Sequence, residues 1–191
     1  MERKNPGITR ETAFELLTEK LGHKDRLFKH SLASEAILRK LAERLGEDPD
    51  FYGIAGLLHD IDLGWLEEDL AEHAIQGADF LAERGVHEEI TTAIRRHNKQ
   101  LDLARETTLD HALAAGETVT GLVIAAALVY PDKKLASVKP KSVRKRYKEK
   151  AFAAGADRAI IAECEQVGIP LSDFLDLSLE ALKEIADDLG L

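Results

Sequence analysis

The chain has 191 residues, and its 26 lysines and arginines against 35 aspartates and glutamates give a formal net charge of −9. With 45% hydrophobic and 32% charged residues it has the composition of a globular protein, which excludes extended disorder, and its length suits one domain. Cys164 is the single cysteine, which excludes an intrachain disulfide and predicts a reducing, cytoplasmic location. The charged first residues predict no secretion signal.

Helical periodicity recurs along the whole sequence. Apolar spacing predicts helices over residues 8–21, 26–45, 50–59, 71–84, 87–97, 108–129, 141–152, 157–167 and 172–189. Gly22, Gly46 and Gly85 supply helix stops, and Asp48-Pro49 supplies an N-cap and a first-turn proline. No segment alternates with period two between turn residues. The predicted fold is therefore all-α, a single-domain helical bundle over residues 1–191, with its core at about 26–130 and residues 131–191 packed on that core.

The helix capped by Thr107 or Thr108 is expected to lie at the centre of the fold. Its second half, GLVIAAALV, is apolar on all sides, which is typical of a buried helix. The longest apolar run, 121–130, is about half of the ~20 residues that span a membrane, so we predict no membrane insertion. Glu117 interrupts this helix, and a carboxylate in a core helix needs a partner, for which a metal ion is a good candidate.

Basic residues are concentrated in one segment. Residues 133–150 contain nine lysines and arginines and one acid, so this segment carries +8 in an otherwise acidic chain. An acidic chain repels polyanions, so we expect no nucleic-acid partner, whereas a local basic patch can attract the phosphates of a small molecule. A solvated basic helix face is an equally good interpretation. The candidate phosphate contacts are Lys141, Arg144, Lys145 and Lys148, with Arg95, Arg96 and Lys99 as competitors nearer to His97.

His59 and Asp60 place an imidazole and a carboxylate at the end of an apolar helix. Adjacent helical residues point about 100° apart, so the two cannot easily pair with each other, but both can hold one cation. A helix-capping pair is the alternative interpretation. Further side chains of metal-ligating type occur in or at the ends of other predicted helices: His30, His73, His97 and Glu117.

This set resembles the H…HD…D pattern of the HD superfamily, which comprises all-helical metal-dependent phosphohydrolases and their relatives. The pattern is carried by His30, by His59-Asp60 and by the segment AAGETVTG, in which Glu117 stands where the family has an aspartate. The resemblance covers about residues 26–158, and the tail at 131–152 is similar to that of an uncharacterised bacterial subgroup. Asp110, seven residues before Glu117 and on the same helix face, is the alternative fourth ligand.

The resemblance also includes the two extra histidines of two-metal members. His73 lies in HAIQGA and His97 in IRRHN, where Asn98 replaces the second histidine of a frequent His-His pair. A second ion would bind His73 and His97, with Asp60 as the bridge. Because Glu117 and Asn98 both depart from the two-metal pattern, one ion is the default expectation.

The resemblance implies a phosphohydrolase that acts on a small phosphorylated compound or nucleotide through a metal-activated water. Two nitrogens and two carboxylates suit Mn, Co, Ni, Fe or Zn. Asp60 and Asp62 are the candidate catalytic residues. Asp62 would act as a general base or orient a water, and a surface or capping role is its alternative interpretation.

Two other functions remain open. Some relatives with the additional histidines hold two irons and activate O₂, so a di-iron oxygenase is one alternative. A catalytically weakened domain that binds a ligand or a partner protein is the other, and Glu117 in place of the expected aspartate is its main support. The sequence favours no particular oligomeric state.

Overall fold

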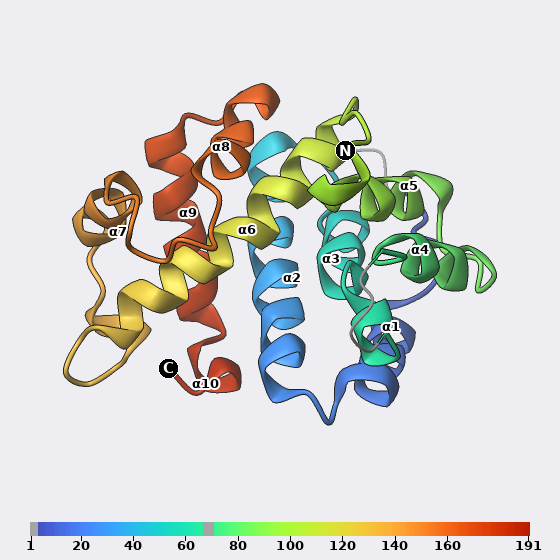
Figure 1. The fold of residues 1–191 in the computed structure, drawn as a ribbon, viewed down its shortest axis with the longest axis horizontal. Helices are drawn as coiled ribbons and strands as arrows, with labels where there is room; N and C mark the ends of the chain where they lie inside the picture. The colour runs from blue at the N-terminus through green and yellow to red at the C-terminus, as the bar shows by residue number, and fades with distance from the viewer. Residues whose placement is uncertain (1–3, 67–70) are drawn as a thin grey trace.

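A computed structural model describes residues 4–66 and 71–191, and within these ranges every regular element is a helix (Figure 1). The all-α prediction is confirmed. In chain order, the helices are α1 (Arg10–Leu21), α2 (Asp25–Leu45), α3 (Pro49–Leu58), η1 (Ile61–Gly64), α4 (Ile75–Ala82), α5 (Glu88–His97), η2 (Lys99–Leu101), α6 (Thr108–Leu128), η3 (Leu135–Ser137), α7 (Pro140–Lys148), α8 (Arg158–Ile161), η4 (Ala162–Val167), α9 (Leu171–Glu184) and α10 (Ala186–Leu189), where η denotes a 3₁₀ helix.

Four predicted helices differ from the observed ones. The helix predicted at 71–84 is shorter, because Ala74 adopts a left-handed backbone conformation (φ 73°) and α4 begins only at Ile75. The segment at 157–167 is a short α-helix followed by a 3₁₀ helix, and the last predicted helix breaks at Ile185. These breaks arise from local backbone conformations that apolar periodicity does not record.

The predicted helix at 141–152 ends early, at Lys148, because the chain then turns around the guanidinium of Arg158. Arg158 donates hydrogen bonds to six backbone carbonyls from this part of the chain. They include Tyr147 at 3.0 Å and Ala153 at 3.0 Å. Arg158 thus satisfies carbonyl groups that a continued helix would have bonded internally.

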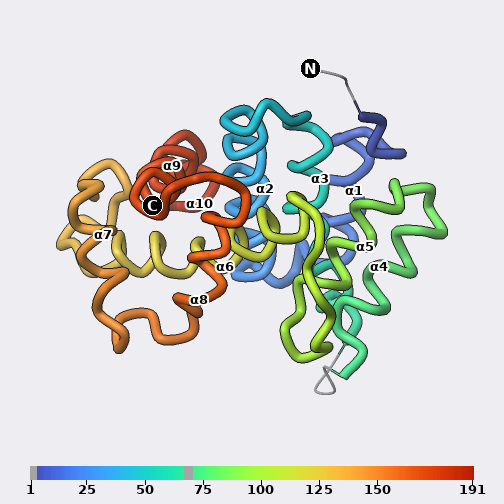
Figure 2. The backbone as a smooth tube through the Cα atoms, turned by 90° about the horizontal axis from the view of Figure 1, so that it is seen from above, coloured from blue at the N-terminus to red at the C-terminus, as the bar shows by residue number. Residues whose placement is uncertain are grey.

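Helices α2 and α6 cross at the centre of the molecule. Gly116 gives room for their close approach, since a Cβ at that position would lie 2.3 Å from Cδ2 of Leu38 and would displace that side chain. Helices α1, α3, α4 and α5 lie on one side of this crossing and α7, α8 and α9 on the other, as Figures 1 and 2 both show. By length and composition α6 could cross a membrane, but 61% of its most apolar window is buried inside the fold, as expected for a core helix.

The start of α6 is held by a buried carboxylate. Thr107 and Asp110 form a capping box, in which Oδ2 of Asp110 accepts the backbone N–H groups of Glu106 (2.8 Å) and Thr107 (3.0 Å). The same oxygen accepts a 2.8 Å hydrogen bond from Nη1 of Arg96. Burial alone would raise the pKa of Asp110, but the two backbone N–H groups and the guanidinium outweigh it and lower the pKa.

We predict that Asp110→Asn lowers the free energy of unfolding by about 1–3 kcal/mol at pH 7, because a charged, buried acceptor is lost. The folded-state pKa of Asp110 lies below its unfolded value of about 3.9, so this contribution is present above that pH and is lost as pH falls through the folded pKa. Urea unfolding at pH 7 and at decreasing pH below 4 should show the difference from wild type narrowing.

Glu106→Gln is the matched control, because it removes the exposed carboxylate partner of the same Arg96. It should change the free energy of unfolding by less than about 0.5 kcal/mol. An Asp110→Asn protein as stable as wild type at pH 7 would contradict the assigned role.

Candidate metal centre

Five parts of the fold bring six ionisable side chains to one place. The six are His30 of α2, His59 and Asp60 at the end of α3, His73 just before α4, His97 at the end of α5 and Glu117 of α6. All six were predicted from the sequence as candidate ligands. The structure brings them together although they are up to 87 positions apart along the chain.

The carboxylate of Asp60 is the common point of contact. Its Oδ2 lies 3.6 Å from Nε2 of His30 and 3.4 Å from Nε2 of His59. Its Oδ1 lies 3.3 Å from Nε2 of both His73 and His97. The described residues therefore contain two groups of three potential ligands, one on each oxygen of Asp60, with the ligand atoms of each group within 4.8 Å of one another.

The Nδ1 atom of each histidine faces an oxygen that accepts a hydrogen bond from it. Nδ1 of His59 lies 2.8 Å from the Gly56 carbonyl, and Nδ1 of His97 lies 2.5 Å from the Ile94 carbonyl. A carbonyl oxygen can only accept, so both Nδ1 atoms carry the hydrogen. In neutral His59 the Nε2 lone pair is then free. Burial opposes the charge of His97, but its hydrogen bond from Nε2 to Asp60 outweighs burial and raises the pKa of His97.

The same arrangement holds for His30. Its Nδ1 lies 3.0 Å from Oγ1 of Thr120, and the Thr120 hydroxyl itself donates to the Glu117 carbonyl at 2.6 Å. Thr120 must therefore accept the His30 Nδ1 hydrogen. Sequence reasoning missed this residue, although a buried hydroxyl three positions after Glu117 in an otherwise apolar helix was the available signal.

The donor set as a whole fits a cation. With both Nδ1 positions protonated, His30 and His59 bring two Nε2 lone pairs to 3.1 Å from each other. Two lone pairs at that distance repel unless a positive charge lies between or beside them. Imidazole nitrogens held this way, next to a carboxylate, match the ligand preferences of borderline divalent ions.

Asp62 holds His73 in place. It is fully buried, and its Oδ1 accepts the Nδ1 hydrogen of His73 at 2.8 Å. Its Oδ2 accepts the backbone N–H groups of Ala74 (2.6 Å) and Gly77 (3.1 Å) at the start of α4. Both oxygens are thus engaged in positioning, which favours the capping interpretation of Asp62 over the predicted general base and excludes a surface position.

The backbone around His73 is constrained by the same contacts. Ala74 is one of the few described non-glycine residues at positive φ, a conformation that costs an L-residue roughly 1–2 kcal/mol. Gly77 lets α4 approach closely, because a Cβ there would lie 3.2 Å from the Asp62 carboxylate. Asn98 adds a clasp, since its Nδ2 donates to the His73 carbonyl at 3.1 Å. Asn98 therefore ties the segments that carry His73 and His97 together.

The electrostatics of the cluster favour bound positive charge. Burial lowers the pKa of His59 to about 3, so this imidazole is neutral at pH 7. Burial opposes the charge of His73 as well, but hydrogen bonds to Asp60 and Asp62 outweigh it and raise the pKa to about 10. Burial also disfavours ionised Asp60, yet the surrounding histidines hold its pKa well below its usual range. A divalent cation would compete with protons for the same nitrogen lone pairs.

Glu117, and not Asp110, is the acid on α6 that reaches the cluster. Its Oε2 lies 3.8 Å from Nε2 of His30, and its Oε1 accepts a hydrogen bond from the Thr118 hydroxyl. Burial raises the pKa of Glu117. Asp110 is instead engaged in capping α6 and in its ion pair with Arg96.

The structure pairs three of the predicted phosphate contacts with carboxylates and places the other four on α7. Arg96 is already paired with Asp110 and Glu106, Arg95 with Asp79, and Lys99 with Asp157. The basic segment forms α7, which packs on α9 and the far end of α6, on the side of the molecule opposite α4 and α5 (Figure 1). The predicted phosphate contacts that lie on α7, and so away from the cluster, are Lys141, Arg144, Lys145 and Lys148.

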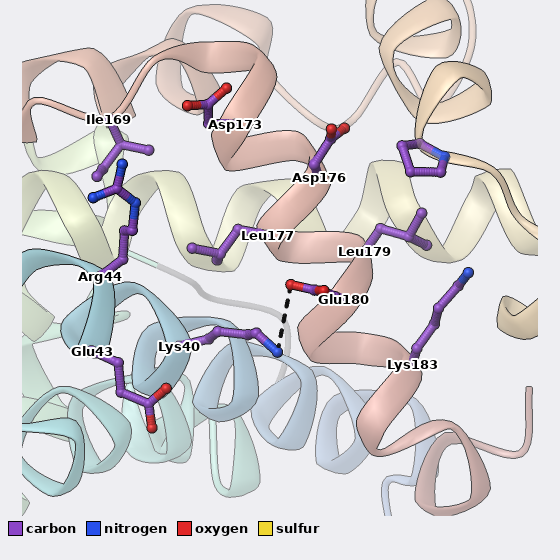
Figure 3. A pocket seen from close by; sticks show the side chains of 11 residues that line it. Lys40, Glu43, Arg44, Ile169, Asp173, Asp176, Leu177, Leu179, Glu180 and Lys183 are labelled. Atoms are coloured by element: carbon purple, nitrogen blue, oxygen red, sulfur yellow. Dashed lines mark ion pairs between the residues drawn. The ribbon is translucent and has the colours of Figure 1, made fainter.

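A surface groove of about 890 Å³ lies between α2 and α9, away from the cluster (Figure 3). Lys40 of α2 and Glu180 of α9 face each other across it at 3.7 Å. Acidic and basic side chains both line this groove, and none of the six cluster residues does.

Comparison with known proteins agrees with the geometry. The family model described as HD domain matches residues 27–154, which include all six cluster residues. No solved structure matches the chain.

We predict that Asp62→Asn weakens divalent metal binding by roughly 10–100-fold, the usual cost of losing a hydrogen-bond partner behind a ligating histidine. An amide in this position turns an N–H group toward either His73 or the start of α4. Titration with Mn²⁺, followed by calorimetry, measures the effect, with thermal unfolding to verify the fold.

Asp79→Asn is the matched control, because Asp79 is an exposed acid on α4 whose partner is Arg95. It should bind Mn²⁺ as wild type does. Equal affinities for wild type and a folded Asp62→Asn protein would refute the positioning role.

Proposed function

Because this chain belongs to the HD domain family, we propose that it is a metal-dependent phosphohydrolase acting on a small phosphorylated compound. The observation that carries the proposal is the pair of three-ligand groups that share Asp60. Each group offers two imidazole nitrogens and one carboxylate oxygen and could hold one divalent ion, with one oxygen of Asp60 in each group. The sequence alone favoured one ion, and we propose two. Asn98, which joins the segments that carry His73 and His97, is compatible with either number.

The proposed ligands divide between the two positions. His30, His59 and Asp60 would hold one ion, with Glu117 beside them, and His73, His97 and Asp60 would hold the other. A divalent ion supplies a water acidified to a pKa of about 7 and a positive charge that offsets the charge of a phosphoryl group.

The residues of the chain supply orientation and exclusion of water. The acceptors behind the rings hold four imidazoles with Nε2 toward Asp60 before any ligand arrives, so little reorganisation is needed on binding. His59 and His97 are buried and close the inner side of the cluster. His30 and Glu117 are the most exposed members, at 24% and 19%, so a substrate would approach between α2 and α6.

A di-iron oxygenase is the second candidate, favoured by the four histidines around one bridging carboxylate. The two candidates differ in the metal that the isolated protein carries. Two irons per chain with a visible or paramagnetic signal would favour the oxygenase, whereas Mn, Co, Ni or Zn with turnover of phosphate esters would favour the hydrolase.

The test of the proposal is turnover of phosphomonoesters and nucleotides by protein loaded with Mn²⁺, Co²⁺, Ni²⁺ or Mg²⁺. We predict that Asp60→Asn lowers turnover by at least ~100-fold and lowers the bound metal, because one ligand group loses its oxygen donor and both groups lose the negative charge. Elemental analysis of the same preparations gives the metal content.

His111→Gln is the control for general effects of replacing a partly buried ionisable residue. His111 pairs with Glu163 outside the cluster, so turnover and metal content should stay at the wild-type level. The proposal fails if no phosphate ester is turned over with any of the four metals, or if Asp60→Asn retains full activity.

A further inference from the structure

Arg26 lies one helical turn before His30 on the same face of α2. Residues four apart on a helix are surface neighbours, with Cβ atoms about 5–6 Å from each other. Arg26 is exposed, and His30 is the most exposed member of the cluster. Arg26 therefore lies beside His30, at the edge of the side on which the cluster is most exposed to solvent.

Arg26 also has no partner among the described residues, in a part of the fold where other cations do. The Nζ of Lys24 donates to the Leu63 carbonyl at 2.5 Å, and Lys29 pairs with Asp25 at 3.1 Å. Across the cluster, Lys99 is paired with Asp157. Within residues 4–66 and 71–191, no hydrogen bond, ion pair or ring contact engages Arg26, so its five N–H donors are available to a ligand.

Arg26 differs from the other described basic residues next to the cluster, because those residues already have partners. The chain carries a net charge of −9, and the described basic residues next to the cluster are neutralised by carboxylates or bound to carbonyls, except Arg26. A single guanidinium matches one phosphate group, which it can bind through two parallel hydrogen bonds. The additional charges of a diphosphate or triphosphate would find no second unpaired cation among the described residues next to the cluster.

We infer that Arg26 binds the phosphate of the substrate at the mouth of the cluster and that the substrate is a monophosphate ester, not a polyphosphate. This inference rests on the proposed hydrolase function. It assigns phosphate recognition to a residue outside the basic segment, and it gives Arg26 a role in substrate binding and none in metal binding.

The first measurement is binding of inorganic phosphate to the Mn²⁺-loaded protein by calorimetry. Arg26→Ala should weaken phosphate binding by about 10–100-fold, the effect of losing a charged hydrogen bond, and Arg26→Lys should recover part of it. Mn²⁺ affinity should not change. Arg44→Ala is the matched control, because Arg44 is an exposed arginine on the last turn of the same helix, far from His30, and should bind phosphate as wild type does.

The second measurement compares adenosine mono-, di- and triphosphate as substrates. We expect the highest kcat/KM for the monophosphate in wild type and, in Arg26→Ala, a raised KM with a smaller change in kcat.

The outcomes distinguish a failure of the role assigned to Arg26 from a failure of the proposed hydrolase function. If wild type binds phosphate but Arg26→Ala binds it equally well, Arg26 is not the contact, while the hydrolase proposal stands. If the di- or triphosphate is preferred, the substrate class is wrong. If metal-loaded wild type neither binds phosphate nor turns over any ester, the proposed function and this inference both fall.

Discussion

The carboxylate of Asp60, surrounded by four imidazoles, is the interaction on which the site depends. A buried carboxylate is costly unless positive charge or hydrogen-bond donors surround it, and here each oxygen meets two ring nitrogens within 3.6 Å. Because the opposite nitrogen of each ring is already bonded to an oxygen, each ring directs its Nε2 inward. Such a cluster is stable only with positive charge inside it, whether from protons, as on His73, or from metal ions.

The fold delivers these groups through a few close contacts. The glycine at 116 allows α6 to lie directly on α2, which brings Thr120 and Glu117 to His30. Across the site, Asp62 and Asn98 join the segments that carry the other two histidines. These supporting residues share one property: each satisfies a buried polar group of the backbone or of a ligand. The rigidity of the site therefore comes from hydrogen bonds around it and not from the ligands alone.

Apolar periodicity predicted the helical fold and most helix positions. The residue types at 30, 59, 60, 73, 97 and 117, together with the resemblance to the HD superfamily, predicted the cluster. The rest depended on contacts between distant segments. Asp62 has a role only because its side chain meets Ala74 and Gly77 across a turn, which shortens α4. The charge of the basic segment predicted phosphate binding, but charge along the sequence does not show where a segment lies in the fold. In the structure α7 packs on the side away from the site. The sequence could not predict the phosphate-binding role proposed for Arg26, because that role depends on the lack of a partner among the described residues.

The central claim is that the four inward-facing histidines and Asp60 bind divalent metal. Anomalous X-ray diffraction from crystals grown with Mn²⁺ tests it most directly. The account predicts two anomalous peaks on opposite sides of the Asp60 carboxylate, one bonded to Nε2 of His30 and His59 and the other to Nε2 of His73 and His97. The absence of any peak within bonding distance of Asp60, in protein saturated with the metal, would contradict it.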